Sequence, residues 1–382
     1  MRRALLPWLA AAALLQGCGS SFELPTENRG NRLIPGDQSY QMLATWTGQD
    51  SIQDILLTQG TGTQLFLLYR RAGVGMAPRG EVRSVPLTRP DPIAGISFPT
   101  LFNPVALASG GGKVFVLDQG DTCLARANPA NGSCETADGW GLKVTNLSAY
   151  WRVREFGLLG GDTLSTFTDT TVAYVRGVAA DAQGRVYVSG TAIINVVISN
   201  PPLILERTSQ YRIYRYVRGP RYPGVDPADR NMPGANWHRD TTWVVEEGSG
   251  VGTVVDPRGL FWSDAGSPAL YVADFGKNWV QKLSDQLRST GFYFLDGGLS
   301  GLPLNGPTEV TVDRQGFVYI TDPGNRRVLR YSSAPDYVQR VDVELDAQGQ
   351  PLGDPVAVAA DDSLVYVADR ALAKVIRYQR RK

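Results

Sequence analysis

Two carboxylates, Asp54 and Glu309, are the side chains whose type and setting best suit chemistry in this chain of 382 residues. Each lies near the start of a short run of apolar and β-branched residues, and the two runs can be aligned with each other. Carboxylate oxygens are ligands that Ca²⁺ prefers, usually together with carbonyls and water. If the fold brings Asp54 and Glu309 together, they are the candidate ligands of a calcium or other metal site.

The chain contains one histidine, His238, in the segment GANWHRD. Because a closed zinc site needs four nitrogen or sulfur ligands, a single histidine argues against the zinc enzymes. His238 is nevertheless the candidate catalytic residue if the protein is a metal-dependent hydrolase or lyase that uses Asp54 and Glu309. The alternative is a surface histidine in a protein without catalysis. No Gly-x-Ser-x-Gly elbow or phosphate-binding loop is present.

A repeated unit of about fifty residues must position these side chains. Its clearest copy runs from Gly306 to Ser333, and each copy has a central apolar run that follows a turn and an inner strand. The six central runs lie around Phe66, Phe115, Tyr187, Tyr271, Tyr319 and Tyr366. Short β-branched runs and turns at this spacing are typical of a β-propeller.

The inner strands of the six copies are expected to converge on a central channel. The positions equivalent to Glu309 are filled mostly by small residues, as such crowding requires: Asp54, Ala106, Gly177, Gly259 and Ala357. Arg176 and Arg258 come one residue before this position in their own copies. The sequence therefore predicts a channel-mouth site formed by Asp54, Arg176, Arg258 and Glu309, in which the arginines compete with a metal for the carboxylates.

Two further positions repeat after the inner strand. An aspartate follows four of the central runs, and we expect it to hold its own turn by accepting backbone N–H groups. A third strand follows, with a basic residue at one position. The aspartates are Asp118, Asp274, Asp322 and Asp369, and the basic residues are Arg126, Arg215, Lys282, Arg330 and Arg377.

The last copy ends soon after its third strand and lacks an outer strand. An unpaired edge invites aggregation, and propellers remove it by taking a strand from the other terminus. The segment Tyr40–Trp46 has the right composition to supply that strand. The predicted fold is all-β: a six-bladed β-propeller of four-stranded antiparallel blades, closed by an N-terminal strand that completes the last blade.

The fifth and sixth copies carry a more specific pattern. In the fifth copy it consists of Pro307, Val310, Val312, Asp313, Gly316, Tyr319, Asp322, Asn325, Arg326 and Val328. This pattern resembles the NHL-repeat propellers, and the resemblance implies one NHL-like domain over residues 40–382. The first copy departs from it, because Tyr69 stands where the repeat has an aspartate.

The chain opens with two arginines, an apolar stretch and the segment Leu15-Gln16-Gly17-Cys18. This resembles a bacterial lipoprotein signal, which implies a signal peptide over residues 1–17, a lipid (palmitate) on Cys18 and a flexible tether over residues 18–39. A plain secretory signal with an incidental cysteine is the alternative. Gly19, and not an aspartate, follows the lipidated residue, which resembles lipoproteins sorted to the outer membrane. The expected location is therefore the bacterial cell envelope, anchored in the outer membrane and facing the periplasm or the surface.

Lipidation of Cys18 leaves an even pair, Cys123 and Cys134, in an oxidising compartment. We expect them to form a disulfide, with a metal pair as the alternative. Without Arg2 and Arg3 the 38 basic residues fall to 36, against 37 acidic ones. This balance argues against nucleic acid as a partner, because binding to phosphate backbones needs concentrated positive charge.

Two insertions are not required by the repeat. The first, Thr191–Gln210, is predicted to be an apolar hairpin that either covers the channel mouth or presents a partner surface. The second, Gly219–Asp240, offers Tyr222 and Trp237 for stacking on a sugar or a peptide. For both insertions the alternative is decoration that packs on its own blade. The sequence therefore favours a lipid-anchored platform without cofactor or catalysis, which binds an envelope protein, a peptide or a glycan. The metal-dependent enzyme is the alternative.

Overall fold

The computed structural model describes residues 40–58, 63–70, 80–85, 87, 98, 101, 103–119, 151–169, 171–197, 205–219, 237–285, 289–293, 303–332, 337–341 and 351–381. Strands make up nearly all the regular structure in these ranges, and a 3-10 turn, η3, covers Pro323–Asn325. The same ranges contain no helix that is long and apolar enough to cross a membrane.

The strands form six sheets, within which all pairings are antiparallel, and we number the sheets along the chain. Sheet 1 contains β2 (Ile52–Leu57), β3 (Leu65–Arg70) and β4 (Gly80–Val85). Sheet 2 contains β5 (Pro104–Gly110), β6 (Lys113–Gln119), β7 (Trp151–Gly157) and β8 (Ser165–Phe167). Sheet 3 contains β9 (Val172–Ala173), β10 (Val178–Ala180), β11 (Val186–Val197), β12 (Leu205–Arg218) and β13 (Trp237–Val245).

The remaining three sheets come from the C-terminal half of the chain, with one strand from the other end. Sheet 4 contains β14 (Pro257–Ser263), β15 (Ala269–Asp274), β16 (Trp279–Ser284) and β17 (Ser289–Tyr293). Sheet 5 contains β18 (Glu309–Val312), β19 (Val318–Asp322), β20 (Arg327–Tyr331) and β21 (Tyr337–Arg340). Sheet 6 contains β22 (Pro355–Ala360), β23 (Leu364–Asp369), β24 (Lys374–Arg380) and β1 (Tyr40–Trp46).

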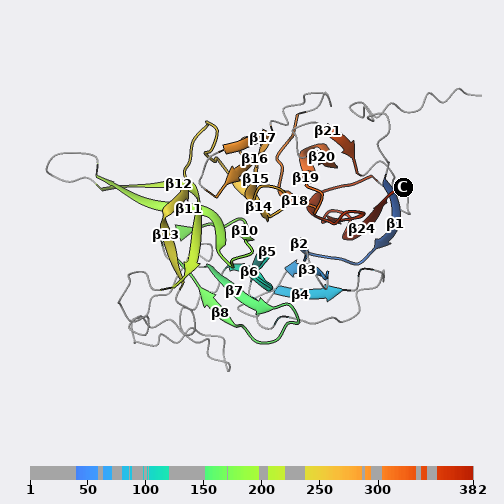
Figure 1. The fold of residues 1–382 in the computed structure, drawn as a ribbon, viewed down its shortest axis with the longest axis horizontal. Coiled ribbons are helices and arrows are strands. Elements are labelled where there is room, and N and C mark those ends of the chain that lie inside the picture. Colours follow the sequence, from blue (N-terminus) through green and yellow to red (C-terminus); the bar gives the residue numbers. More distant parts are fainter. Residues whose placement is uncertain are drawn as a thin grey trace, which may run out of the picture.

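The innermost strand of each sheet contacts the innermost strand of the next, in the cyclic order β2, β5, β10, β14, β18, β22 and back to β2. Figure 1 shows the sheets arranged around this central region. The approach is so close that a side chain at Gly259 would place its Cβ 2.7 Å from the Cα of Glu309. Gly177 lies equally tightly against the backbone of Arg258. The small residues predicted for the inner strands are thus required by their packing.

Hydrophobic clusters lie between neighbouring sheets. Between sheets 1 and 2, for example, Phe98 packs edge-on against Phe156 with ring centroids 4.5 Å apart, and Phe66 lies next to it. Five further clusters join sheets 2 to 3, 3 to 4, 4 to 5, 5 to 6 and 6 to 1. Each large buried side chain contributes about 1.5–3 kcal/mol of transfer free energy, so the contacts between sheets supply most of the stabilisation.

The strand β1 pairs antiparallel with β24, from Tyr40 opposite Arg380 to Trp46 opposite Val375, as the sequence predicts for this segment. Its first residue is also held by the neighbouring sheet. The hydroxyl of Tyr40 lies 2.9 Å from that of Tyr319, which donates a hydrogen bond to Asp313 over 3.0 Å. The first described strand is therefore joined to both sheet 6 and sheet 5.

One strand prediction is wrong. The sequence placed the third strand of the second copy at Cys123, with Arg126 at the repeated basic position. In the structure β7, residues Trp151–Gly157, pairs with β6 instead. Glu155 lies opposite Phe115, where Arg330 lies opposite Tyr319 in sheet 5. The insertion in sheet 2 is therefore much longer than expected, and residues 120–150 lie outside the described part of the chain.

Candidate functional site

Asp54 lies on the innermost strand of sheet 1 and is buried. Its carboxylate accepts the N–H of Ile55 over 2.7 Å and, across the sheet boundary, the N–H of Leu107 over 2.6 Å. Burial raises the pKa of Asp54 to about 7, although these two hydrogen bonds act in the opposite direction. The carboxylate thus joins sheet 1 to sheet 2 and can hold a proton at neutral pH.

Glu309 is the first residue of β18 and is partly buried. One of its oxygens accepts the N–H of Val310 over 3.2 Å. Burial, and then the negative charge of Asp54, raise the pKa of Glu309 well above its usual value. The fold therefore brings the two predicted carboxylates within electrostatic reach of each other.

The two arginines predicted at the same mouth have a different partner. Arg258 forms an ion pair of 2.8 Å with Asp256 and lies over the ring of Phe275, 3.3 Å from its centroid. Arg176 lies 4.0 Å from the same carboxylate. The predicted competition of the arginines for Asp54 and Glu309 is thus replaced by binding to Asp256. That aspartate comes two residues before Arg258, and this spacing is the signal in the sequence for the pair.

The donor set around Asp54 and Glu309 is poor for calcium. Both oxygens of Asp54 are occupied by backbone N–H groups, whereas Ca²⁺ takes six to eight oxygen ligands. Across the described ranges, no group of three or more His, Cys, Asp or Glu side chains is placed to hold a metal ion. What this pair can do with the groups present is share and release protons.

His238 does not join this pair. It lies on β13, which ends its sheet, whereas Asp54 and Glu309 lie on innermost strands. The backbone of His238 pairs with Val217, and its Nδ1 is buried without a hydrogen-bond partner among the described residues. The set of three residues considered for a hydrolase or lyase is therefore not assembled.

Trp237 was predicted to be free for stacking on a ligand, and this is wrong. Its ring stacks on Phe167 with centroids 4.7 Å apart, and the guanidinium of Arg218 lies 4.9 Å from its centroid. The indole N–H donates to the hydroxyl of Ser165 over 3.1 Å. Trp237 is part of the packing between sheets 2 and 3. Its predicted companion Tyr222 lies outside the described residues, as do Cys18, Cys123 and Cys134.

The repeated aspartates accept backbone N–H groups, as predicted. Asp369 accepts the N–H of Leu372 in the turn that follows it, as expected, but other donors lie elsewhere. Asp322 accepts the N–H of Asn305, and Asp274 accepts the N–H groups of Val255 and Asp256. These donors belong to the chain that enters the inner strand of the same sheet, well before each aspartate. These aspartates therefore fix how the inner strand begins, and Asp369 also holds the turn that comes after it.

The predicted apolar hairpin exists and has a definite direction. β11 and β12 stay paired from Val186 opposite Tyr216 to Val197 opposite Leu205. Figure 1 shows this hairpin projecting outward from sheet 3, away from the central region. The suggestion that it covers the channel mouth is therefore wrong, and the alternatives of a partner surface and of decoration on its own sheet stay open. We call residues 193–197 and 205–209 the arm.

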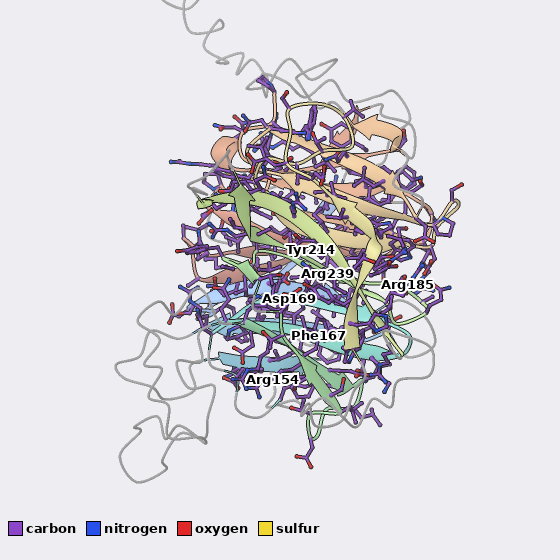
Figure 2. All side chains as sticks on the ribbon, turned by 90° about the vertical axis from the view of Figure 1, so that its left-hand side faces the viewer. Arg154, Phe167, Asp169, Arg185, Tyr214 and Arg239 are labelled. Carbon is purple, nitrogen blue, oxygen red and sulfur yellow. The ribbon has the colours of Figure 1, made fainter. Side chains whose placement is uncertain are left out.

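Within the described residues the strands of the arm pair only with each other. β9 pairs with β11 at Thr191 and Ala192, and β13 pairs with β12 no further out than Ile213. Further in, within the body of sheet 3, Arg239 forms an ion pair of 3.5 Å with Asp169 and lies over the ring of Tyr214. Figure 2 shows these three side chains grouped above Phe167.

A cavity of about 190 Å³ lies at the other end of the inner strands from Asp54 and Glu309. The far ends of β2, β5, β10 and β14 form its walls, together with the β5–β6 turn. The walls combine apolar side chains with polar groups in similar measure, and Lys113 and Asp264 are its charged residues. Sequence reasoning missed this cavity because its residues match no motif and come from four copies of the repeat.

No protein-family model matches the chain, and no curated protein shows significant sequence similarity to it. Among solved structures it is similar to a protein of unknown function from Bacteroides caccae, at 10% identity over 80% of this chain and 82% of that one, with a TM-score of 0.42. It is also similar to the PQQ-bound aldose sugar dehydrogenase of Streptomyces coelicolor, at 13% identity over 90% and 99% of the two chains, with a TM-score of 0.48. For an inactive virginiamycin B lyase of Staphylococcus aureus with quinupristin, the identity is 11% over 89% and 99%, and the TM-score is 0.45.

Proposed function

We propose that the protein is a lipid-anchored, NHL-like six-bladed β-propeller of the bacterial cell envelope, which binds a protein, peptide or glycan without catalysing a reaction. In this proposal the six sheets are the blades and β1 closes the last of them. The observation that carries the binding function is the arm. It is not needed for the repeat, and it extends a two-stranded ribbon away from the body of the molecule (Figure 1).

The backbone of the arm favours an extended peptide segment as the bound partner. Each strand of a two-stranded ribbon has one edge whose N–H and C=O groups have no partner in a sheet. An extended peptide can add to such an edge as a further strand, and the side chains along it then provide specificity. The pairing of β9 with Thr191 and Ala192 of β11 holds the ribbon at its base, and a ribbon held in one orientation loses less entropy on binding.

The proposal is tested by removing the arm. Ala192 and Gln210 are opposite each other at its base, so residues 193–209 can be replaced by Asn-Gly, a two-residue turn suited to hairpins. Envelope proteins crosslinked to this variant are compared with those crosslinked to the unaltered chain and to Asp54→Asn. We expect specific partners to be lost only without the arm, with the melting temperature preserved. An unchanged set of partners would refute the role of the arm.

The anchor and the address are tested separately. We propose that residues 1–17 are removed, that Cys18 carries palmitate and that residues 18–39 form the tether at the outer membrane. Labelled palmitate should enter the unaltered chain and not Cys18→Ala, and membrane fractionation then shows which membrane holds it. We also propose the Cys123–Cys134 disulfide, for which a mass shift after reduction and alkylation is the check.

A metal-dependent hydrolase or lyase is the second candidate, and one observation favours it. Asp54 raises the pKa of Glu309, so the two carboxylates are close enough to interact. Calcium bound between them would draw both pKa values down. Elemental analysis of the purified chain, and calcium titration of Asp54→Asn and Glu309→Gln beside the unaltered chain, decide the matter. Binding of calcium that both substitutions abolish would support the enzyme over the platform.

A further inference from the structure

We propose that the cavity beside the β5–β6 turn binds a small molecule with an apolar body and a single carboxylate, at a site separate from the arm. The cavity has a volume of about 190 Å³. A protein cavity of about 150 Å³ lined by apolar side chains can hold benzene. The space here therefore suits a six-membered ring with a short side chain, and is too small for an oligosaccharide or a folded partner.

Leucine side chains on three walls can contact an apolar body, and polar groups make up the rest of the lining. Leu56 lines the cavity from sheet 1, Leu107 from sheet 2 and Leu260 from sheet 4. Ala179 from sheet 3 and the glycines of the β5–β6 turn leave the space open because they have little or no side chain. Gly111 and Gly112 have φ values of 56° and 72°, which a residue with a side chain rarely adopts. The opening is thus a consequence of how this turn is built.

Lys113 is the group that would receive the carboxylate. Its side chain is 37% exposed and lies at the end of the glycine turn, on the cavity wall. Its present partner is Glu155, 3.3 Å away. Glu155 does not depend on Lys113, because it also accepts hydrogen bonds from Ser165 and Arg218. The ammonium of Lys113 can therefore turn to a ligand without leaving a buried carboxylate alone.

Asp264 limits the charge of the ligand. It lies on the wall formed by sheet 4, and its carboxylate accepts the indole N–H of Trp262 over 2.9 Å. This negative charge would repel a second carboxylate. A cationic ligand would have to compete with the positive Lys113. One carboxylate on an otherwise apolar molecule is the chemistry that satisfies both residues.

The test uses isothermal titration calorimetry of the purified full chain at pH 7 with three probes of one shape: 3-phenylpropanoate, 3-phenylpropanamide and 3-phenylpropylamine. We expect the carboxylate to bind one to one and about tenfold more tightly than the amide, because a charged hydrogen bond is lost in the amide. Lys113→Gln should reduce the carboxylate to the level of the amide and leave the amide unchanged. Lys374→Gln, on β24 of another sheet, is the matched control and should change neither.

A second variant tests the cavity itself. Ala182 lines it from an exposed turn, so Ala182→Leu fills the space without entering the core, and binding of both the carboxylate and the amide should be lost. Circular dichroism shows whether each variant is folded, and Lys113→Gln decides alone if Ala182→Leu is not. Absence of binding to the unaltered chain, equal affinity for carboxylate and amide, or tighter binding of the amine would each overturn the proposal. Arm deletion should leave this binding unchanged, which separates it from the partner function.

Discussion

The carboxylates at the ends of the second strands and those on the innermost strands experience opposite surroundings. Asp322 is fully buried, yet it accepts hydrogen bonds from the N–H of Asn305 at 2.7 Å, the amide of Asn325 at 2.8 Å and the guanidinium of Arg327 at 2.6 Å. Asp54 is buried and accepts hydrogen bonds from two backbone N–H groups, and Glu309, which is partly buried, accepts one. The negative charge of Asp322 is neutralised by Arg327, whereas among the described residues Asp54 and Glu309 have no cationic partner.

This difference follows the repeat. An aspartate that recurs in successive copies has its donors supplied by the same copy, because the surrounding backbone recurs with it. Asp54 and Glu309 stand where the other copies have alanine or glycine. Each accepts the N–H of the residue that follows it, but neither has an arginine partner among the described residues. The repeated aspartates thus stabilise the fold, whereas Asp54 and Glu309 are withdrawn from water at a cost in solvation free energy.

The largest effect is expected from Asp322→Ala. It leaves the guanidinium of Arg327, only 4% exposed, without its carboxylate. We expect the free energy of unfolding to fall by about 3–5 kcal/mol, as when one partner of a buried ion pair is removed. Urea unfolding measures it. Asp354→Ala, which removes an exposed ion pair with Arg370, is the matched control and should cost less than about 1 kcal/mol. Equal losses would show that burial of the Asp322–Arg327 pair does not increase its contribution to stability.

Gly259→Ala tests the close packing around the innermost carboxylates. Its Cβ would lie 2.7 Å from both the Cα of Glu309 and the carbonyl oxygen of Thr308, and backbone atoms cannot move aside cheaply. We expect a loss of about 1–3 kcal/mol in the free energy of unfolding. The control is Gly250→Ala, where nothing lies within 4 Å of the added carbon. A neutral result at Gly259 would mean that the inner strands are less tightly packed than the structure has them.

Glu309→Gln addresses the charge directly. Because the pKa of Asp54 is raised to about 7 and that of Glu309 is raised as well, the folded chain holds protons that the unfolded chain releases near pH 4. The free energy of unfolding should therefore fall as the pH rises from about 4 through about 7. The substitution should raise it by about 1–2 kcal/mol at pH 8 and change it little at pH 4.

Urea unfolding at the two pH values is the measurement for Glu309→Gln, with Glu246→Gln as its control. Glu246 is 61% exposed in its pair with Arg212, so its substitution should not depend on pH in this way. If Glu309→Gln were less stable than the unaltered chain at pH 8, a cation or another hydrogen-bond donor would be compensating the negative charge of Asp54 and Glu309.

The smallest effect is expected from Arg176→Ala. Its ion pair with Asp256 is long, at 4.0 Å, and its side chain is 45% exposed. The free energy of unfolding should change by less than about 0.5 kcal/mol. If this substitution instead changed the pH dependence of unfolding, Arg176 would be acting on Asp54 and Glu309 after all. That result would restore the competition first expected from the sequence.

The repeat allowed much of the fold to be predicted, because alternating apolar runs and turns are local signals. The pairing of Tyr40–Trp46 with the last strand was accessible too, since the final copy lacked a strand. The third strand of sheet 2 was misplaced although its signal exists: RVREF at Arg152 aligns with RVLRY at Arg327, residue for residue in the observed pairing. The long insertion before it and Glu155 at the usual basic position concealed the match.

The site was harder to predict than the fold. The equivalence of Asp54 and Glu309 could be read from alignment, which identified the carboxylates that interact. The contact of Arg176 with Asp256 and the packing of Trp237 against Phe167 depend on contacts between different copies, whereas Arg258 and Asp256 lie two residues apart in one copy. The cavity exists because the glycines of the β5–β6 turn have no side chains to fill the space between that turn and sheets 1, 3 and 4. Such features arise from packing over long sequence separations, which periodicity does not contain.

The way β1 is held has a mechanical consequence. Any pull on the chain before Tyr40 acts first on the hydroxyl contact with Tyr319 and on the pair formed with Arg380. The same strand is paired with the last strand of the sequence, so the force passes at once to residues far apart in the chain and to two sheets. A tether joined here would load the body of the protein as one piece, and detachment would have to begin by peeling this strand away.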